Sequence, residues 1–471
     1  MLGLNSWMNL PSHSGRAFLA LFAALTCTAP LVLAQDTRPV KEPVTPPSCT
    51  RLAAELTSIN GSLAESDESK LDTQRIQKAI DSCQPGQAVT LIANEPQNAF
   101  LSGALHLRAG VTLVVDKGVT LFASRDPRVF EVSPGSCGIV NERGRGCKAL
   151  INGENASDAG VMGPGTIDGR GGSKLLDQNV SWWDLAQQAK VTNKAQNCPR
   201  LLILNRCNNF TLYNVTLKNS PNFHVSYMMG NGFTAWGVVI YSPKTARNTD
   251  GIDPANSTNV TITHCSIHTG DDQVAIKAGG KVPSTNMSIV HNHFYTGHGM
   301  SIGSETDSGA NHILVSDLTI DGADNGIRIK SNASRGGLVE DITYENVCIR
   351  DTKNPIFMDT NYSAAPNNTH DKLPTFRNII LKHVHILDGG KITLEGLDAA
   401  HPLQMSFDDV TVSGAPKVSA RFGDFQLGPG PVNFSISGED VHVTGKPTGK
   451  SKGEVCEGKF VPMPVPNGTN P

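Results

Sequence analysis

An octapeptide pattern recurs eight times in the second half of the chain and restricts the fold more than any other feature. The copies are FTLYNVTL, FTAWGVVI, VTITHCSI, MSIVHNHF, ILVSDLTI, ITYENVCI, IILKHVHI and MSFDDVTV, which begin at Phe210, Phe233, Val260, Met287, Ile313, Ile342, Ile379 and Met405. Their starts lie 23, 27, 27, 26, 29, 37 and 26 residues apart. This period is too short for a propeller blade, and the leucine-rich consensus is absent, so a different solenoid is indicated.

Each octapeptide has the pattern of a strand, a corner and a second strand. Its first, third and eighth residues are apolar, and so is its sixth except at Asn292. A straight strand alternates with period two, so the chain must bend between the third and sixth residues. The fifth residues are Asn214, Gly237, His264, His291, Asp317, Asn346, His383 and Asp409. These residue types adopt left-handed backbone angles most readily. We therefore expect an all-β, single-domain right-handed parallel β-helix, with the histidines serving as corners and not as ligands.

The segment before the repeats predicts one helix. DTQRIQKAIDSC, from Asp72 to Cys83, places Ile76, Ala79 and Ile80 at helical spacing after Asp72, a residue type that caps helices. A helix here would cover the exposed strand edges at the open end of the coils. We expect it to cap the β-helix at its N-terminal end.

The N-terminal sequence reads as an export signal. Arg16 precedes the apolar run AFLALFAALTCTAPLVLA, and the residues VLA before Gln35 fit the small-residue rule for cleavage. Threonine and proline interrupt the run, which favours a cleaved signal over a membrane anchor, so we expect a secreted protein. The expected divisions are a signal peptide over 1–34, a flexible segment over 35–48, the β-helix over 49–445 and a poorly ordered tail over 446–471.

Composition and cysteines narrow the class further. The chain of 471 residues has 40 basic and 43 acidic side chains, which argues against a nucleic-acid partner, and no second long apolar run indicates a membrane partner. Export permits disulfides among the cysteines. Two pairs flank short segments and can form bridges: Cys137 with Cys147, and Cys49 with Cys83. Cys265 and Cys348 lie inside strand patterns, where a small buried apolar residue is the ordinary interpretation. No C-x-x-C pair occurs, so zinc is not expected.

A second set of strands lies between the octapeptides and carries charged residues. The segments are TDGIDP, DDQVAIKA, GHGMSIGSE and DNGIRIKS. Aligning Ile252, Val274, Met300 and Ile327 places Asp250, Asp272, His298 and Asn325 in one column. Because neighbouring strands lie about 4.8 Å apart, Asp250 and Asp272 should be neighbours, with His298 one step further along.

The orientation of the Asp-Asp pair needs a turn. Strict alternation would point Asp272 into the core, where a lone carboxylate is costly. Gly270 and its turn can break the alternation and direct Asp271 and Asp272 to the outer face, beside Arg328 and Lys330. Alone, an Asp-Asp in a glycine-rich turn or an Arg-x-Lys on a strand is ordinary surface. Their convergence predicts an exposed groove floor with interacting charges, which is typical of a functional site.

NTDG, GDD, GHG and RIK, in this order and one coil apart, resemble the four signature motifs of the polygalacturonase family of glycoside hydrolases. The similarity runs from about Cys49 to about Val412 and is greatest to the bacterial secreted endo-acting members. It implies hydrolysis of α-1,4-linked galacturonan with inversion at the anomeric carbon. Inversion requires one carboxylic acid to protonate the leaving oxygen and one carboxylate to activate water on the opposite face.

The resemblance also implies roles for individual residues. Asp271 is the acid, Asp250 and Asp272 hold and activate the water, and His298 influences the protonation of the acid. The implied substrate-binding residues are Arg328, Lys330, Asn248 and Tyr362. The two cations offer charge-assisted donors to the substrate carboxylates. Asn248 can equally be a turn residue, and Tyr362 an exposed loop residue. No metal or cofactor is expected, and the predicted partner of a monomeric protein is polygalacturonate or pectin.

Alternatives remain open from the sequence. A pectate lyase also uses a β-helix, but it binds calcium and eliminates, and the GHG and RIK motifs argue against it. An exo-acting polygalacturonase, a rhamnogalacturonan hydrolase and a non-catalytic carbohydrate-binding β-helix are the others. Endo action is favoured because no large inserted N-terminal domain is visible.

Overall fold

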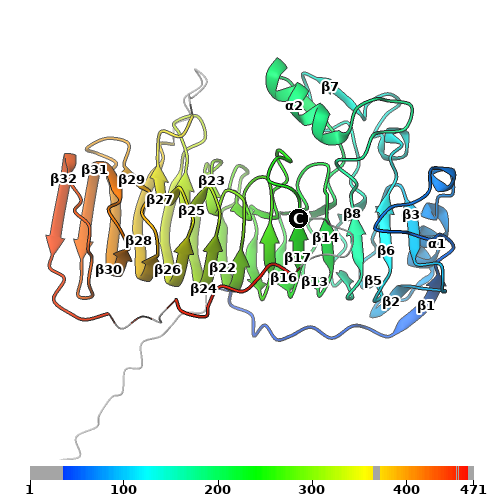
Figure 1. The fold of residues 1–471 in the computed structure, drawn as a ribbon, viewed down its shortest axis with the longest axis horizontal. Helices are drawn as coiled ribbons and strands as arrows, with labels where there is room; N and C mark the ends of the chain where they lie inside the picture. Colours follow the sequence, from blue (N-terminus) through cyan, green and yellow to red (C-terminus); the bar gives the residue numbers. More distant parts are fainter. Residues whose placement is uncertain (1–35, 364–371, 452, 454–455, 465–471) are drawn as a thin grey trace, which may run out of the picture. The chain divides into compact units, whose positions relative to one another are not determined.

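The computed structural model describes residues 36–363, 372–451, 453 and 456–464. They belong to one compact unit of the chain, Ala34–Pro471. The expected signal peptide over 1–34 lies outside the described residues. The described strands form a 30-stranded sheet whose strands pair in parallel, and successive strands lie side by side in Figure 1. The sheet winds in coils with three faces, and the predicted parallel β-helix is confirmed.

The first face, which we call the site face, carries the charged motifs. It contains β4 (Leu105–His106), β8 (Ile151–Glu154), β12 (Leu202–Asn205), β15 (Val225–Met228), β18 (Ile252–Ala255), β21 (Val274–Ile276), β23 (Met300–Gly303), β25 (Asn325–Lys330), β27 (Asn354–Asp359), β29 (Lys391–Glu395) and the start of β31 (Lys417–Leu427). These strands stack in chain order, so each coil adds one strand to the face.

The second and third faces meet at the octapeptide corner. The second contains β1 (Ser48–Ala53), β2 (Gln87–Ile92), β5 (Val111–Val115), β9 (Gly160–Met162), β13 (Phe210–Tyr213), β16 (Asn231–Trp236), β19 (Thr258–Thr263) and β32 (Gly438–Gly445). The third contains β3 (Ala99–Ser102), β6 (Thr120–Ala123), β10 (Thr166–Asp168), β14 (Thr216–Lys218), β17 (Val239–Tyr241) and β20 (Ser266–His268). Long bent strands then span both faces: β22 (Ser284–Phe294), β24 (Ala310–Asp321), β26 (Leu338–Arg350), β28 (Thr375–Ile386) and β30 (Leu403–Val412).

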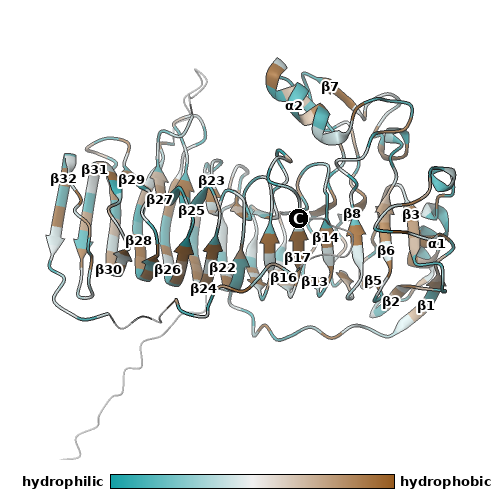
Figure 2. Cartoon of the chain, in the orientation of Figure 1, coloured by the Kyte–Doolittle hydropathy of each residue, from teal (hydrophilic) through white to brown (hydrophobic). Residues whose placement is uncertain are grey.

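The octapeptides stack in the predicted register. The first residue of each copy pairs with the first residue of the next. The fifth residue of every copy has a positive φ, between 49° and 65°, as the corner interpretation requires. Asn292, the polar exception at the sixth place, is fully buried. Its side-chain amide accepts from the N–H of Cys265 and donates to the carbonyl of Ile262, both at 2.9 Å. Figure 2 shows hydrophobic residues along the strands and hydrophilic residues in many of the turns.

The predicted capping helix is α1 (Thr73–Ser82), whose Ile76, Ala79 and Ile80 are buried. The side chain of Asp72 does not cap the helix but accepts from the N–H of Leu101. The remaining described elements are η1 (Glu65–Asp67), η2 (Pro127–Phe130), α2 (Trp182–Thr192) and the antiparallel pair β7 (Ile139–Asn141) and β11 (Ala195–Asn197). Within the described residues, no helix combines the length and apolarity needed to cross a membrane.

Three disulfides join the described coils: Cys49–Cys83, Cys137–Cys147 and Cys348–Cys456. The first two are those that the flanking positions predict. The third corrects the interpretation of Cys348 as only a small buried apolar residue, because its partner comes from the C-terminal segment. Cys265 is unpaired and fully buried, as expected.

Two terminal segments expected to be loosely held make specific contacts. Asp36 is buried, its N–H donates to the Ser288 hydroxyl at 3.0 Å, and its carboxylate accepts from the Thr261 hydroxyl at 2.7 Å. These partners lie on β22 and β19, far in the stack from β1, so the segment over 36–47 runs across several coils (Figure 1). In the C-terminal segment, the carbonyl of Val461 accepts from the side chain of a tyrosine just after β22 at 3.1 Å.

Candidate active site

The strand pairing of the site face brings the predicted motifs together. Ile252 pairs with Val274, Val274 with Met300, and Met300 with Ile327, and all four are fully buried. The alternate residues point outward in two columns. The first column contains Ser226, Asp253, Ala275, Ser301, Arg328 and Phe357, and the second contains Met228, Ala255, Lys277, Gly303, Lys330 and Asp359. The small side chains of Ala275 and Ser301 leave room over the first column for the aspartates that precede each strand.

Asp272 faces outward, as predicted, and is held by three donors. Its Oδ1 accepts from the Ser301 hydroxyl at 2.7 Å and from Nη1 of Arg328 at 3.0 Å, and its Oδ2 accepts from Nζ of Lys330 at 2.8 Å. Although burial opposes the effect, the Lys330 ammonium and the Arg328 guanidinium hold the pKa of Asp272 well below its usual range. Asp272 is therefore a fixed negative charge.

Asp250 has the opposite environment. It is 3% exposed, and its Oδ1 has no hydrogen-bond partner among the described residues. Burial, together with the nearby carboxylates of Asp253 and Asp271, raises the pKa of Asp250 well above its usual range. The Lys277 ammonium opposes this effect at 3.8 Å from Oδ2, but it also lies 3.6 Å from Asp253, so its charge is shared. Asp250 consequently takes up a proton much more readily than Asp272 does.

Asp271 and His298 are the accessible members of the group. Their side chains are 20% and 35% exposed, and Nδ1 of His298 lies 3.0 Å from Oδ1 of Asp271. The same oxygen accepts from the N–H of Asp272 at 2.9 Å. Burial lowers the pKa of His298, but the hydrogen bond and charge of Asp271 outweigh this effect, so that the pKa is raised overall. The site thus places three carboxyl groups in three different environments.

The expectation of an exposed floor is wrong for most of these residues. Asp250 and Asp272 are nearly inaccessible, and Arg328 and Lys330 are each only 6% exposed. The two cations are covered because they bind Asp272 and because the Tyr362 ring lies over them, with its centroid 5.2 Å from Cζ of Arg328 and 5.4 Å from Nζ of Lys330. The structure therefore places Tyr362 against the predicted basic pair.

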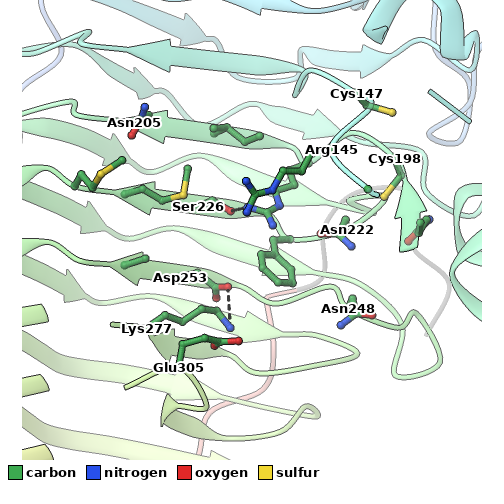
Figure 3. A pocket seen from close by; sticks show the side chains of 18 of the residues that line it. Arg145, Cys147, Cys198, Asn205, Asn222, Ser226, Asn248, Asp253, Lys277 and Glu305 are labelled. Atoms are coloured by element: carbon green, nitrogen blue, oxygen red, sulfur yellow. Dashed lines mark hydrogen bonds and ion pairs between the residues drawn. The ribbon is translucent and has the colours of Figure 1, made fainter. Parts of the chain in front are cut away.

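Asn248 lies at the edge of an adjacent hollow of about 900 Å³ (Figure 3). Its φ is 56°, so it is also a turn residue in the left-handed region. Both expectations for Asn248 therefore describe its position. The hollow is open on the same side of the site face as the catalytic group, because Asp253 and Lys277 belong to both.

Four residues of the site and its hollow were missed from the sequence. Asp253 and Lys277 occupy outward positions on β18 and directly after β21, and an alignment of every outward column would have found them. Arg200 and Phe223 lie in turns before β12 and β15. They have no repeat pattern, so no sequence signal points to them.

The grouping of Asp271, Asp272 and His298 is close enough to meet a metal ion, since their ligand atoms all lie within 4.8 Å of one another. Both oxygens of Asp272 already bind cationic groups, Arg328 and Lys330, so this carboxylate offers a metal little uncompensated charge. A metal-free site stays a prediction.

Comparisons with known proteins agree with this site. Residues 83–423 match the family described as Glycosyl hydrolases family 28. An endo-polygalacturonase of Pectobacterium carotovorum subsp. carotovorum is 46% identical over 403 residues, which are 85% of this chain and 96% of the relative. A polygalacturonase of Ralstonia solanacearum is 39% identical over 491 residues, covering 90% of this chain and 92% of the relative.

The solved structure of the polygalacturonase from Erwinia carotovora ssp. carotovora has 45% sequence identity and a TM-score of 0.77, over 83% of this chain and 100% of that one. It shares the parallel coils described above. With its signature motifs gathered on one face of a β-helix, the chain belongs to family 28 of the glycosyl hydrolases and is an enzyme.

Proposed function

We propose that this enzyme is a secreted endo-polygalacturonase, which hydrolyses the α-1,4-galacturonosyl linkages of polygalacturonate with inversion. One observation carries the proposal: three neighbouring carboxyl groups differ in environment, with Asp272 fixed as an anion, Asp250 buried with a raised pKa, and Asp271 accessible beside His298. An inverting hydrolase needs carboxyl groups that differ in this way, because one gives a proton while another receives one. The identity of 46% to an endo-polygalacturonase supports the substrate.

The proton donor is Asp271. Its Oδ1 is used by His298 and by the N–H of Asp272, while its Oδ2 makes no hydrogen bond among the described residues and can carry the proton. This proton passes to the glycosidic oxygen as the bond from that oxygen to the anomeric carbon breaks. Water attacks the same carbon from the opposite face and gives its proton to the pair Asp250 and Asp272. Asp250 must be ionised to accept it.

The basic residues match the charge of the substrate. Arg328 and Lys330 carry two positive charges against the single negative charge of Asp272, so their surroundings favour an anion. Each galacturonate ring supplies one carboxylate. Charge-assisted hydrogen bonds to such a group are about twice as strong as neutral ones. Tyr362, which packs over both cations, borders the place that this carboxylate would occupy.

Polygalacturonate digestion in excess chelator tests the reaction type. We expect reducing ends to increase at the same rate with and without chelator, and no ultraviolet absorbance from unsaturated sugars. Chelator-sensitive formation of absorbing products would overturn the proposal in favour of a calcium-dependent lyase. The lengths of early products test the mode of action, since endo cleavage yields a broad range of oligomers and exo cleavage yields only the terminal unit.

A further inference from the structure

The hollow beside the catalytic group lies on the side away from Arg328 and Lys330. It extends over the coils of β12, β15, β18 and β21, whereas the basic pair lies on β25, two strands beyond β21. Asp250 precedes β18, and Asp271 and Asp272 precede β21, so the carboxyl groups lie between the two places. A polysaccharide laid along the site face with one ring at the basic pair therefore extends into the hollow on the other side of the cleaved bond.

The charged lining of the hollow is positive overall. Four basic residues and two acidic residues line it, a difference of two positive charges: Arg143, Arg145, Arg200 and Lys277 against Asp253 and Glu305. Figure 3 shows Arg145 above, and Asp253, Lys277 and Glu305 from successive coils below. A hollow with this balance favours an anionic ligand.

Phe223 holds two of these cations in place. Cζ of Arg200 lies 4.4 Å from the centroid of the Phe223 ring, and Nζ of Lys277 lies 5.2 Å from the same centroid. Nη1 of Arg200 also donates to the Ser226 hydroxyl at 3.0 Å. Lys277 is already paired with Asp250 and Asp253, whereas the described residues form no ion pair with Arg200. Arg200 is thus an oriented cation whose charge is not matched.

Asp253 supplies a polar group that the fold does not satisfy. It is 2% exposed and lines the hollow, and neither of its carboxylate oxygens has a hydrogen-bond partner among the described residues. The Lys277 ammonium is near Oδ2, but at 3.6 Å it forms an ion pair without a hydrogen bond. Buried polar atoms are usually hydrogen-bonded, so these oxygens point to a ligand that brings donors, such as the hydroxyl groups of a sugar.

We propose that the hollow is a binding subsite for a galacturonate ring on the opposite side of the cleaved bond from Arg328 and Lys330. In this subsite Arg200 binds the ring carboxylate and Asp253 binds the ring hydroxyl groups. Phe223 positions Arg200 and Lys277. The subsite rests on the proposed hydrolysis of polygalacturonate and identifies the residues that select an acidic sugar at this position.

The test is Arg200→Gln, with Arg377→Gln as the matched control. Arg377 is half-exposed, pairs with Glu340 on the outside of the coils and lies far from the site face. We expect kcat/KM on polygalacturonate to fall about 10- to 100-fold in R200Q, the range for losing a charged hydrogen bond, and to stay unchanged in R377Q. In pentagalacturonate labelled at its reducing end, R200Q should also change which bond is cut most often, because the oligomer then binds in positions that avoid the hollow.

The bond preference separates substrate binding from a structural defect, since a partly misfolded enzyme is slower at every bond without changing the preferred one. Arg200→Lys keeps the charge without the planar fork, and it serves if the glutamine variant fails to fold. It should show a smaller loss and the same change of bond. Unchanged kcat/KM and bond preference in both variants would overturn the subsite and leave the proposed function standing, whereas a wild-type enzyme that does not cut polygalacturonate would overturn both.

Discussion

Two histidine–aspartate pairs, each joining neighbouring coils, show how one architecture uses the same side chains for different ends. His291 and Asp317 lie at the octapeptide corner, with Nδ1 and Oδ2 2.6 Å apart, and His298 and Asp271 lie at the site face, with Nδ1 and Oδ1 3.0 Å apart. The corner residues are required by the backbone, because both have the positive φ of the bend.

Nothing in the backbone requires the pair at the site face. Asp271 instead stands next to a buried anion, Asp272, and close to a second buried carboxyl group, Asp250. Like charges crowded in this way weaken a fold unless other groups compensate them. The comparison teaches that the column in which an Asp or His stands, and not its type or its partner, distinguishes a structural pair from a functional one.

The largest expected effect comes from Asp271→Asn. Removing the proton donor should lower kcat on polygalacturonate by about 10²- to 10⁴-fold, the usual contribution of general acid catalysis. Asp317→Asn makes the same chemical change at the corner and should leave kcat within about twofold. Reducing-end assays and thermal unfolding of both variants check this. Turnover by D271N at the wild-type rate would erase the distinction between the two pairs.

Asp272→Ala should cost stability as well as activity. It leaves Arg328 and Lys330 buried without their carboxylate, and such a loss destabilises by about 3–5 kcal/mol. Because the pKa of Asp272 is depressed in the folded state, its contribution is complete above the pKa of an unfolded aspartate, about 3.9, and declines only as pH falls below it. Denaturant unfolding at pH 7 measures the loss. Asp317→Ala, at an exposed pair, should cost about 1 kcal/mol or less.

His298→Asn should reduce kcat by roughly tenfold or more, since its hydrogen bond to Asp271 orients the donor and controls its proton. KM should change little, because this bond matters most as the proton moves. The corner equivalent, His291→Asn, provides the comparison and should behave as wild type in steady-state kinetics. A similar loss in both variants would mean that either histidine acts only through the stability of the coils.

Asp253→Asn should change the pH profile. The negative charge of Asp253 helps to raise the pKa of Asp250, and its removal lowers that pKa while leaving Lys277 entirely to Asp250. Asp250 must be ionised to receive the water proton, so the acidic limb of kcat/KM should move to lower pH. The position of this limb is independent of any loss in its height. An acidic limb that stays in place would exclude Asp250 as the group that sets it.

The coils and the catalytic column were predictable because both follow from short-range rules. The corner residues declare the bend, and the register of one strand on the next places Asp250, Asp272 and His298 together. The subsite residues Arg200 and Phe223 were not predictable, since they stand in turns whose lengths differ from coil to coil.

Long-range contacts also escaped the sequence. The bond between Cys348 and Cys456 closes 108 residues of chain, and no local pattern specifies such a pairing. The burial of Arg328 and Lys330 depends on Tyr362, which arrives from a later turn. Periodic patterns therefore predict which residues share a face, whereas the covering of that face depends on turns that do not repeat.

The buried Asp36 has a consequence for how the coils come apart. In a stack where each coil touches only its neighbours, an end can open one rung at a time. The segment that begins at Asp36 fastens the first rungs to β19 and β22, next to the rungs that hold the catalytic carboxyl groups. Peeling of the N-terminal rungs must then either release this fastening or pull on the middle of the stack, so fraying at that end and loss of the active groove become one linked event.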